Sequence, residues 1–184
     1  MAQILIMSTF RDRFPHVVTF RKCGKIEICG KIHCKMLSEN VTYAAYMVFK
    51  LHPTSFYGLD YPFQEASISV GEGHKSISQV CLQSCVEEAD GSDESPSSYT
   101  CLGITCSYRL EWEFTPGDDM AIPRRRDDSW MEVELGELYN EEGCEGEVPV
   151  SLTETTLTSK RGLILFGIEF RNKIQKPTRS ARVM

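Results

Sequence analysis

The feature of this sequence that most restricts its fold is a two-residue alternation of apolar and polar side chains, repeated in short runs from residue 25 onward. A period of two places successive side chains on opposite faces of a β-strand. The clearest runs span residues 25–31, 66–70, 108–114, 131–135 and 148–152, with turn-forming glycines and prolines between them. Many short strands at this spacing predict an all-β fold, specifically an antiparallel β-sandwich.

Two further runs, residues 43–51 and 163–170, are apolar at nearly every position rather than at alternate ones. Such strands are buried on both faces. We therefore expect these two strands to be central in their sheets and the one-sided strands to lie at the surface.

Three segments lack a clear period, and they bound or interrupt one expected domain over residues 25–171. Residues 1–24 are mixed in character and are predicted to be irregular. Residues 86–100 are acidic and serine-rich, which predicts a flexible loop. Residues 172–184 are basic and without apolar periodicity, which predicts a disordered tail.

The charge and hydropathy of the chain limit its partners. With 20 Lys and Arg against 26 Asp and Glu, the formal net charge of −6 disfavours nucleic acid, because neutralising phosphates takes clustered cations. The one dense basic run, residues 124–126, is followed at once by two aspartates and is interpreted as a solvated loop. No apolar stretch approaches the roughly 18 residues of a membrane span, and the apolar N-terminus is too short for a signal peptide. We expect no membrane partner and a location in the cytoplasm and nucleus, where cysteines stay reduced.

Metal and catalytic motifs are sparse, so we expect neither a cofactor nor an enzyme. Cys81 and Cys85 are followed by Cys101 and Cys106, but their three- and four-residue gaps are wider than in most zinc ribbons, and ordinary thiols are the simpler interpretation. The histidines sit in unrelated contexts, and no nucleophile elbow or phosphate-binding loop occurs. The glutamates that a glycosidase would need (Glu132, Glu134, Glu137 and Glu147) lie on alternating strands, where they are expected to form a solvated face.

Three ordered blocks carry a family resemblance. Residues 30–51 contain GKI, KMLS and YAAYMVFKL, residues 128–140 read DSWMEVELGELYN, and residues 146–171 contain GEV, SLTE, KRGLI and GIEFR. Together they resemble the phloem protein 2 (Nictaba-related) lectin domain of plants. The wording is closest to the branch that attaches an N-terminal F-box, the module that joins ubiquitin-ligase scaffolds.

The resemblance implies a jelly-roll-like β-sandwich that binds N-acetylglucosamine oligomers or N-glycans in the cytosol and nucleus. In the F-box branch, the sugar domain would select glycosylated substrates for ubiquitination. The carbohydrate-binding residues it implies here are Glu147 and Lys160, with the carboxylate accepting and the ammonium donating hydrogen bonds. The alternative for this pair is two solvated loop charges, or an ion pair between them. Trp130 is expected to anchor the sandwich rather than to stack on sugar, and Trp112 is expected to pack in the core.

The chain also departs from the family pattern. The family's sugar site draws on tryptophans ahead of the first block, whereas the first tryptophan here is Trp112, and Ser159 replaces an aromatic residue before the turn lysine. Residues 1–24 leave no room for an F-box and are expected to be a truncated or rebuilt start of the domain. Two hypotheses follow: a lectin with weak or altered sugar binding, or a protein-interaction or substrate-recognition module that has lost sugar binding.

Overall fold

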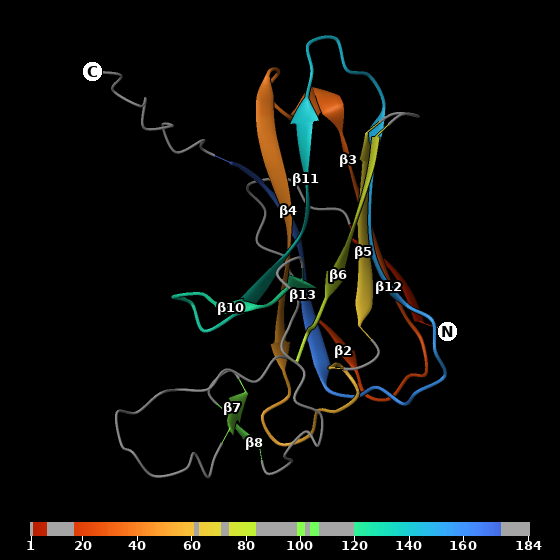
Figure 1. Cartoon of the computed structure of the whole chain (residues 1–184), viewed down its shortest axis with the longest axis vertical. Coiled ribbons are helices and arrows are strands. Elements are labelled where there is room, and N and C mark those ends of the chain that lie inside the picture. The colour runs from red at the N-terminus through yellow and green to blue at the C-terminus, as the bar shows by residue number, and fades with distance from the viewer. Residues whose placement is uncertain are drawn as a thin grey trace, which may run out of the picture.

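Two β-sheets packed face to face form the body of the protein in the computed structural model, which describes residues 2–6, 17–60, 63–70, 74–83, 99–101, 104–106 and 120–173 (Figure 1). The first sheet has the strand order β1 (Ala2–Ile6), β3 (Ile26–His33), β12 (Glu147–Glu154), β5 (Gln64–Val70), β6 (His74–Val80) and β9 (Met120–Ala121). The second has the order β10 (Arg124–Arg125), β11 (Met131–Asn140), β4 (Val41–Leu51), β13 (Leu163–Asn172) and β2 (Val18–Phe20). A separate hairpin pairs β7 (Tyr99–Cys101) with β8 (Ile104–Cys106), and the one helical turn described is the 3-10 segment η1 (Cys34–Met36).

This architecture confirms the predicted all-β sandwich. Most neighbouring strands are antiparallel, but β1 runs parallel to β3 and β9 runs parallel to β6, so the first sheet is mixed. Strands distant in sequence pair with one another: β3 with β12, and β4 with both β11 and β13. These pairings join the two ends of the chain into one structure.

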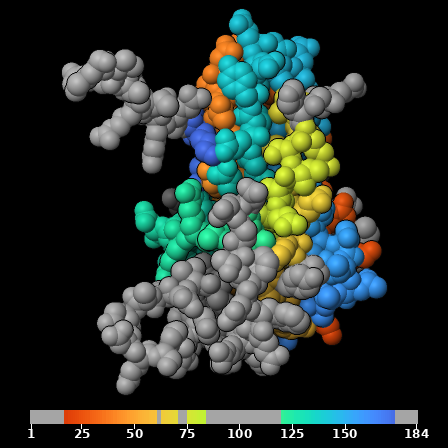
Figure 2. Space-filling view, in the orientation of Figure 1, coloured from red at the N-terminus to blue at the C-terminus, as the bar shows by residue number. Residues whose placement is uncertain are grey.

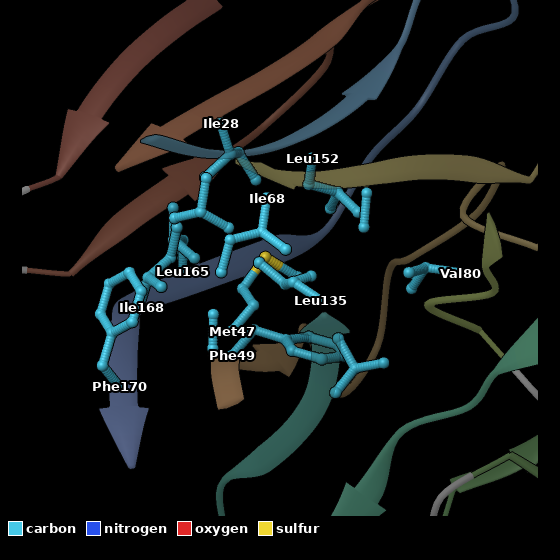
Figure 3. Packing of buried hydrophobic residues seen from close by; sticks show 14 of the residues in the cluster. Ile28, Met47, Phe49, Ile68, Val80, Leu135, Leu152, Leu165, Ile168 and Phe170 are labelled. Atoms are coloured by element: carbon cyan, nitrogen blue, oxygen red, sulfur yellow. The ribbon is translucent and has the colours of Figure 1, made fainter. Parts of the chain in front are cut away.

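The two apolar strands are central, as predicted. β4 lies between β11 and β13, and β13 lies between β4 and β2. Their inward side chains meet those of β3, β5 and β12 from the other sheet in one buried cluster (Figure 3). The labelled members are Ile28, Met47, Phe49, Ile68, Val80, Leu135, Leu152, Leu165, Ile168 and Phe170. Burying side chains of this size stabilises the fold by about 1.5–3 kcal/mol each before chain entropy is counted.

Within the described part of the first 24 residues, residues 2–6 and 17–24, two strands occur where the sequence pattern predicted an irregular segment. β1 pairs with β3 from Ala2 to Ile6, and β2 pairs with β13 and buries Phe20. Both are short edge strands whose hydrogen bonds come from the neighbouring backbone, so an alternating side-chain pattern is not needed to form them. Most of the predicted acidic loop and basic tail, and Trp112, lie outside the described residues.

Within the part of the chain that the structure describes, no helix has the length and apolar character that crossing a membrane requires.

Candidate functional site

The two residues predicted to bind sugar do not lie together. Glu147 is the first residue of β12, whereas Lys160 follows the end of that strand and contacts its last residue, Glu154. An eight-residue strand is about 23–27 Å long, so the two side chains lie at opposite ends of the sandwich. They form neither an ion pair with each other nor one compact site.

Glu147 is an exposed carboxylate at the surface of the first sheet. Its Oε1 lies 2.8 Å from Nζ of Lys31 on the neighbouring strand β3. Exposed ion pairs of this kind contribute about 0–1 kcal/mol, so a ligand could displace Lys31 at little cost. The sugar-binding role of Glu147 stays a prediction.

Lys160 is fully buried, with 0% of its surface exposed, which is the opposite of the predicted loop charge. Its Nζ donates to the carbonyl oxygens of Gly24 at 2.9 Å and Thr158 at 2.8 Å, and it forms an ion pair with the buried carboxylate of Glu154. Burial lowers the pKa of Lys160 from its ordinary value. The contacts of its Nζ are made within the protein and hold the turn between β12 and β13, and the sugar-binding role of Lys160 stays a prediction.

Trp130 packs against the outside of the sandwich. It precedes β11 and lies half-buried on the outer face of the second sheet, outside the hydrophobic core. Its ring centroid is 4.7 Å from that of Phe166, and Nζ of Lys50 lies over the ring at 4.4 Å from the centroid. Contacts of this kind stabilise the outer face by cation–π attraction and aromatic packing.

A network of charges continues along the same outer face. The carboxylate of Glu132, only 4% exposed, accepts from Nε of Arg124 at 2.7 Å and lies 2.6 Å from Arg171. Burial acts to raise the pKa of Glu132, but hydrogen bonds from Arg171 and Arg124 outweigh it and hold the pKa below its usual range. Arg126 reaches Glu169 at 3.2 Å. Arg124, Arg126 and Glu132 therefore belong to one charge network, although Arg124 and Arg125 are exposed as predicted. Of the glutamates predicted to form a solvated face, Glu132 is buried.

A groove follows the seam between the two sheets, where β11 runs beside β6. In Figure 2 the cyan surface of β11 and the yellow-green surface of β6 lie side by side along this line. Two hollows of about 510 and 610 Å³ occupy the seam and share Ser76 and Glu137 in their walls. We name their union the seam groove. Its walls mix apolar residues with hydroxyls, carboxylates, two tyrosines and a few cations. The polar and aromatic members are Tyr46, Lys75, Ser76, Ser78, Arg124, Glu132, Glu134, Glu137, Tyr139, Glu141, Glu142 and Glu145, and the others are Ile68, Val70, Met120, Ala121, Ile122, Gly136, Leu138, Gly143 and Cys144.

A β-bulge in β11 shapes this groove. The register of β11 against β4 shifts between Glu134 and Gly136, and Gly136 has a φ of 151°, a conformation that favours glycine. A Cβ at this position would lie 2.7 Å from the side chain of Ile68, so only glycine lets β11 approach β5 this closely. Across the seam, the Ser78 hydroxyl donates to the carbonyl of Leu135 at 3.2 Å.

The two tyrosines of the seam groove differ in how open their rings are. Tyr46 is half-buried, donates to Glu134 at 3.0 Å, and has the Arg171 guanidinium 4.7 Å from its ring centroid. Burial and the Glu134 carboxylate raise the pKa of its hydroxyl. Tyr139 is 49% exposed, and its hydroxyl is held by Asn40 at 3.2 Å. The structure therefore presents one oriented aromatic ring in a groove lined by carboxylates and hydroxyls.

The alternation of residues 131–135 did not extend to Tyr139, and continuing it unchanged past Gly136 would turn residues 137 and 139 inward. The bulge moves Leu138 inward and turns Glu137 and Tyr139 outward. The glycine within the alternating run was the one sequence signal for this reversal.

The fold and the seam groove define a β-sandwich with a recessed surface of mixed polar and apolar character, an architecture suited to ligand recognition. The family described as Phloem protein 2 matches residues 5–172, so the chain belongs to the phloem protein 2 family, as the resemblance indicated.

Similar curated proteins come from Arabidopsis thaliana. F-box protein PP2-B15 is 36% identical over 88% of this chain and 55% of its own length. F-box protein VBF is 35% identical over 88% of this chain and 56% of its own length. F-box protein PP2-B7 is 32% identical over 90% of this chain and 47% of its own length. The chain thus spans about half the length of the curated relatives it matches.

Proposed function

We propose that this chain is a carbohydrate-binding, lectin-like module that recognises N-acetylglucosamine oligomers or N-glycans in the cytosol and nucleus, and that it binds without catalysing a reaction. Family membership supports the class of ligand. The observation that carries the proposal is the half-exposed ring of Tyr139, fixed by Asn40 within the seam groove.

The chemistry of the seam groove fits a sugar. A pyranose ring has an apolar C–H face that packs on an aromatic ring, and hydroxyls around its edge that need acceptors and donors. Tyr139 supplies the aromatic face, and the carboxylates of Glu141 and Glu142 supply acceptors in the same wall. Ser76 and Lys75 supply donors from β6 on the opposite wall.

Glu137 forms the link between the two hollows. Its carboxylate is paired with Lys173, and this hydrogen bond raises the pKa of the Lys173 ammonium. A sugar hydroxyl that donates to Glu137 would share that carboxylate with Lys173, so the ion pair presents an oriented acceptor. Because Lys173 already orders the Glu137 carboxylate, the side chain loses less conformational entropy when the ligand binds.

A glycan array with the purified chain, followed by titration of the best ligand, tests the proposal. We expect Tyr139→Ala to weaken binding about tenfold, since stacking and lost contact area contribute about 1–1.5 kcal/mol. Tyr57→Ala is the matched control, because Tyr57 is similarly exposed, at 41%, and its hydroxyl contacts Ser159 beside the Lys160 turn. If Tyr57→Ala loses binding and Tyr139→Ala binds as tightly as the unchanged chain, the sugar site lies at the Lys160 turn instead of the seam groove. No glycan signal above background would refute sugar binding.

A second candidate is supported by the relatives. Those named above are F-box proteins, and this chain matches about half of their length. The chain would then act as the substrate-recognition part of a ubiquitin-ligase protein, with the groove binding protein rather than sugar. Capture of partners from a plant extract before and after enzymatic removal of N-glycans separates the two. The second candidate is favoured if the captured partners include ubiquitin-ligase subunits and are still retained after deglycosylation.

A further inference from the structure

Two cysteine thiols from distant parts of the chain touch at one end of the sandwich. Cys34 is the first residue of η1, directly after β3, and Cys144 lies in the loop between β11 and β12. Their Sγ atoms are 2.6 Å apart, only about 0.6 Å beyond the length of a disulfide bond. Of the five cysteines whose side chains the structure describes, these two form the pair in contact.

The backbone around the two thiols is already held in place. The amide of Cys34 donates to the carbonyl of Gly146 at 3.0 Å, which ties η1 to the β11–β12 loop. Within that loop, the amide of Cys144 donates to the carbonyl of Glu141 at 3.1 Å. Lys35 and Glu145 add an exposed ion pair at 3.1 Å between the same two segments. Bond formation between the thiols therefore needs little movement of the chain.

We propose that Cys34 and Cys144 form a reversible disulfide by exchange with a low-molecular-weight disulfide of the glutathione type. In the first step one protein thiolate attacks the small disulfide, forms a mixed disulfide and releases one glutathione thiolate, which takes up a proton. In the second step the other protein thiolate attacks the protein sulfur of the mixed disulfide and releases the second glutathione. The protein loses two protons and two electrons, and the small disulfide gains them and is reduced to two thiols.

The burial of the two sulfurs sets the order of attack. Cys34 is only 2% exposed, whereas Cys144 is half-buried. Burial, together with the contact with Cys144, raises the pKa of the Cys34 thiol to about 11. A small disulfide can reach Cys144 but not Cys34, so Cys144 attacks first and Cys34 resolves the mixed disulfide from within the protein.

The bond would fix one wall of the seam groove. Residues 141–145 line the groove beside Tyr139, and the disulfide would fasten this loop to η1. Oxidation would thereby order the wall in advance of ligand. This consequence for binding rests on the proposed function, whereas formation of the disulfide does not.

The chain of 184 residues, treated with oxidised and then reduced glutathione, tests the site. We expect the loss of two thiols per chain, a mass lower by two hydrogens, and a tryptic peptide joining Cys34 to Cys144. Because the bond closes a loop of about 110 residues, Tm should rise on the order of 5–15 °C and return on reduction. Cys144→Ser should abolish all of these changes, and Cys29→Ser, at a half-buried cysteine of β3, should leave them intact.

Some results would overturn the site. These are a mixed disulfide at Cys144 that persists without resolution, a linkage to any other cysteine, or a full Tm shift in Cys144→Ser. If the disulfide forms and a glycan ligand is known, affinity for that glycan should rise a few-fold in the oxidised chain. Unchanged affinity would overturn the effect on the groove. If neither redox form binds any glycan, the proposed function fails while the thiol and Tm results still decide the disulfide.

Discussion

At the scale of single residues, the buried ion pair between Lys160 and Glu154 tests the structural role assigned to that lysine. Removing one partner of a buried pair leaves an uncompensated charge and costs about 3–5 kcal/mol. We expect Lys160→Ala to lower the free energy of unfolding by this amount, measured by urea denaturation followed by circular dichroism. Lys31→Ala, which breaks the exposed pair with Glu147, should cost about 1 kcal/mol or less. Equal effects from the two variants would contradict the buried position of Lys160.

Glu132 provides a second test at this scale, through pH. Its folded pKa is lowered, so the stability it contributes is present above its unfolded value of about 4.5 and is lost as pH falls through the lower folded value. Glu132→Gln should therefore be less stable than the natural chain at pH 7, by on the order of 2 kcal/mol, and the difference should shrink below pH 4.5. Unfolding free energies measured between pH 7 and 3 give both quantities. Glu147→Gln is the control, and a gap that stays constant with pH for Glu132→Gln would contradict the network.

At the scale of elements, the bulge in β11 determines which side chains reach the seam groove. Gly136→Ala places a Cβ against Ile68 and in an unfavourable φ, so we expect a loss of about 1–3 kcal/mol in unfolding free energy. Gly143→Ala is a matched control, because Gly143 also has a positive φ of 75° but nothing lies within 4 Å of its Cβ position. It should cost about 1 kcal/mol. If the two variants lose equal stability in denaturant titrations, close approach to Ile68 is not what requires Gly136.

The same bulge shows why the elements were easier to predict than the site. Alternation and apolar runs are local, and they correctly indicated β4 and β13 as central strands. The outward orientation of Tyr139 depends on a register shift of β11 against β4. The burial of Lys160 depends on contacts with Gly24 and Glu154. Neither is a property of a short sequence window. The family resemblance transfers residue types but not their surroundings, so it did not reveal that Glu147 and Lys160 lie at opposite ends of β12.

At the scale of the whole molecule, the first 24 residues decide whether the sandwich is complete. β2 pairs with β13 and buries Phe20, and Gly24 supplies an acceptor to Lys160. Deleting residues 1–24 should therefore lower the free energy of unfolding by more than the roughly 3–5 kcal/mol expected for Phe20→Ala alone. For a chain of 184 residues, a loss of about 3–5 kcal/mol corresponds to a fall in Tm of about 6–20 °C, which calorimetry can detect. The deletion should lower Tm by more than Phe20→Ala does. Val17→Ala, at a half-exposed position beside β2, should change Tm little. A deletion variant that unfolds at the same Tm as the undeleted chain would show that the sandwich does not depend on its first two strands for stability.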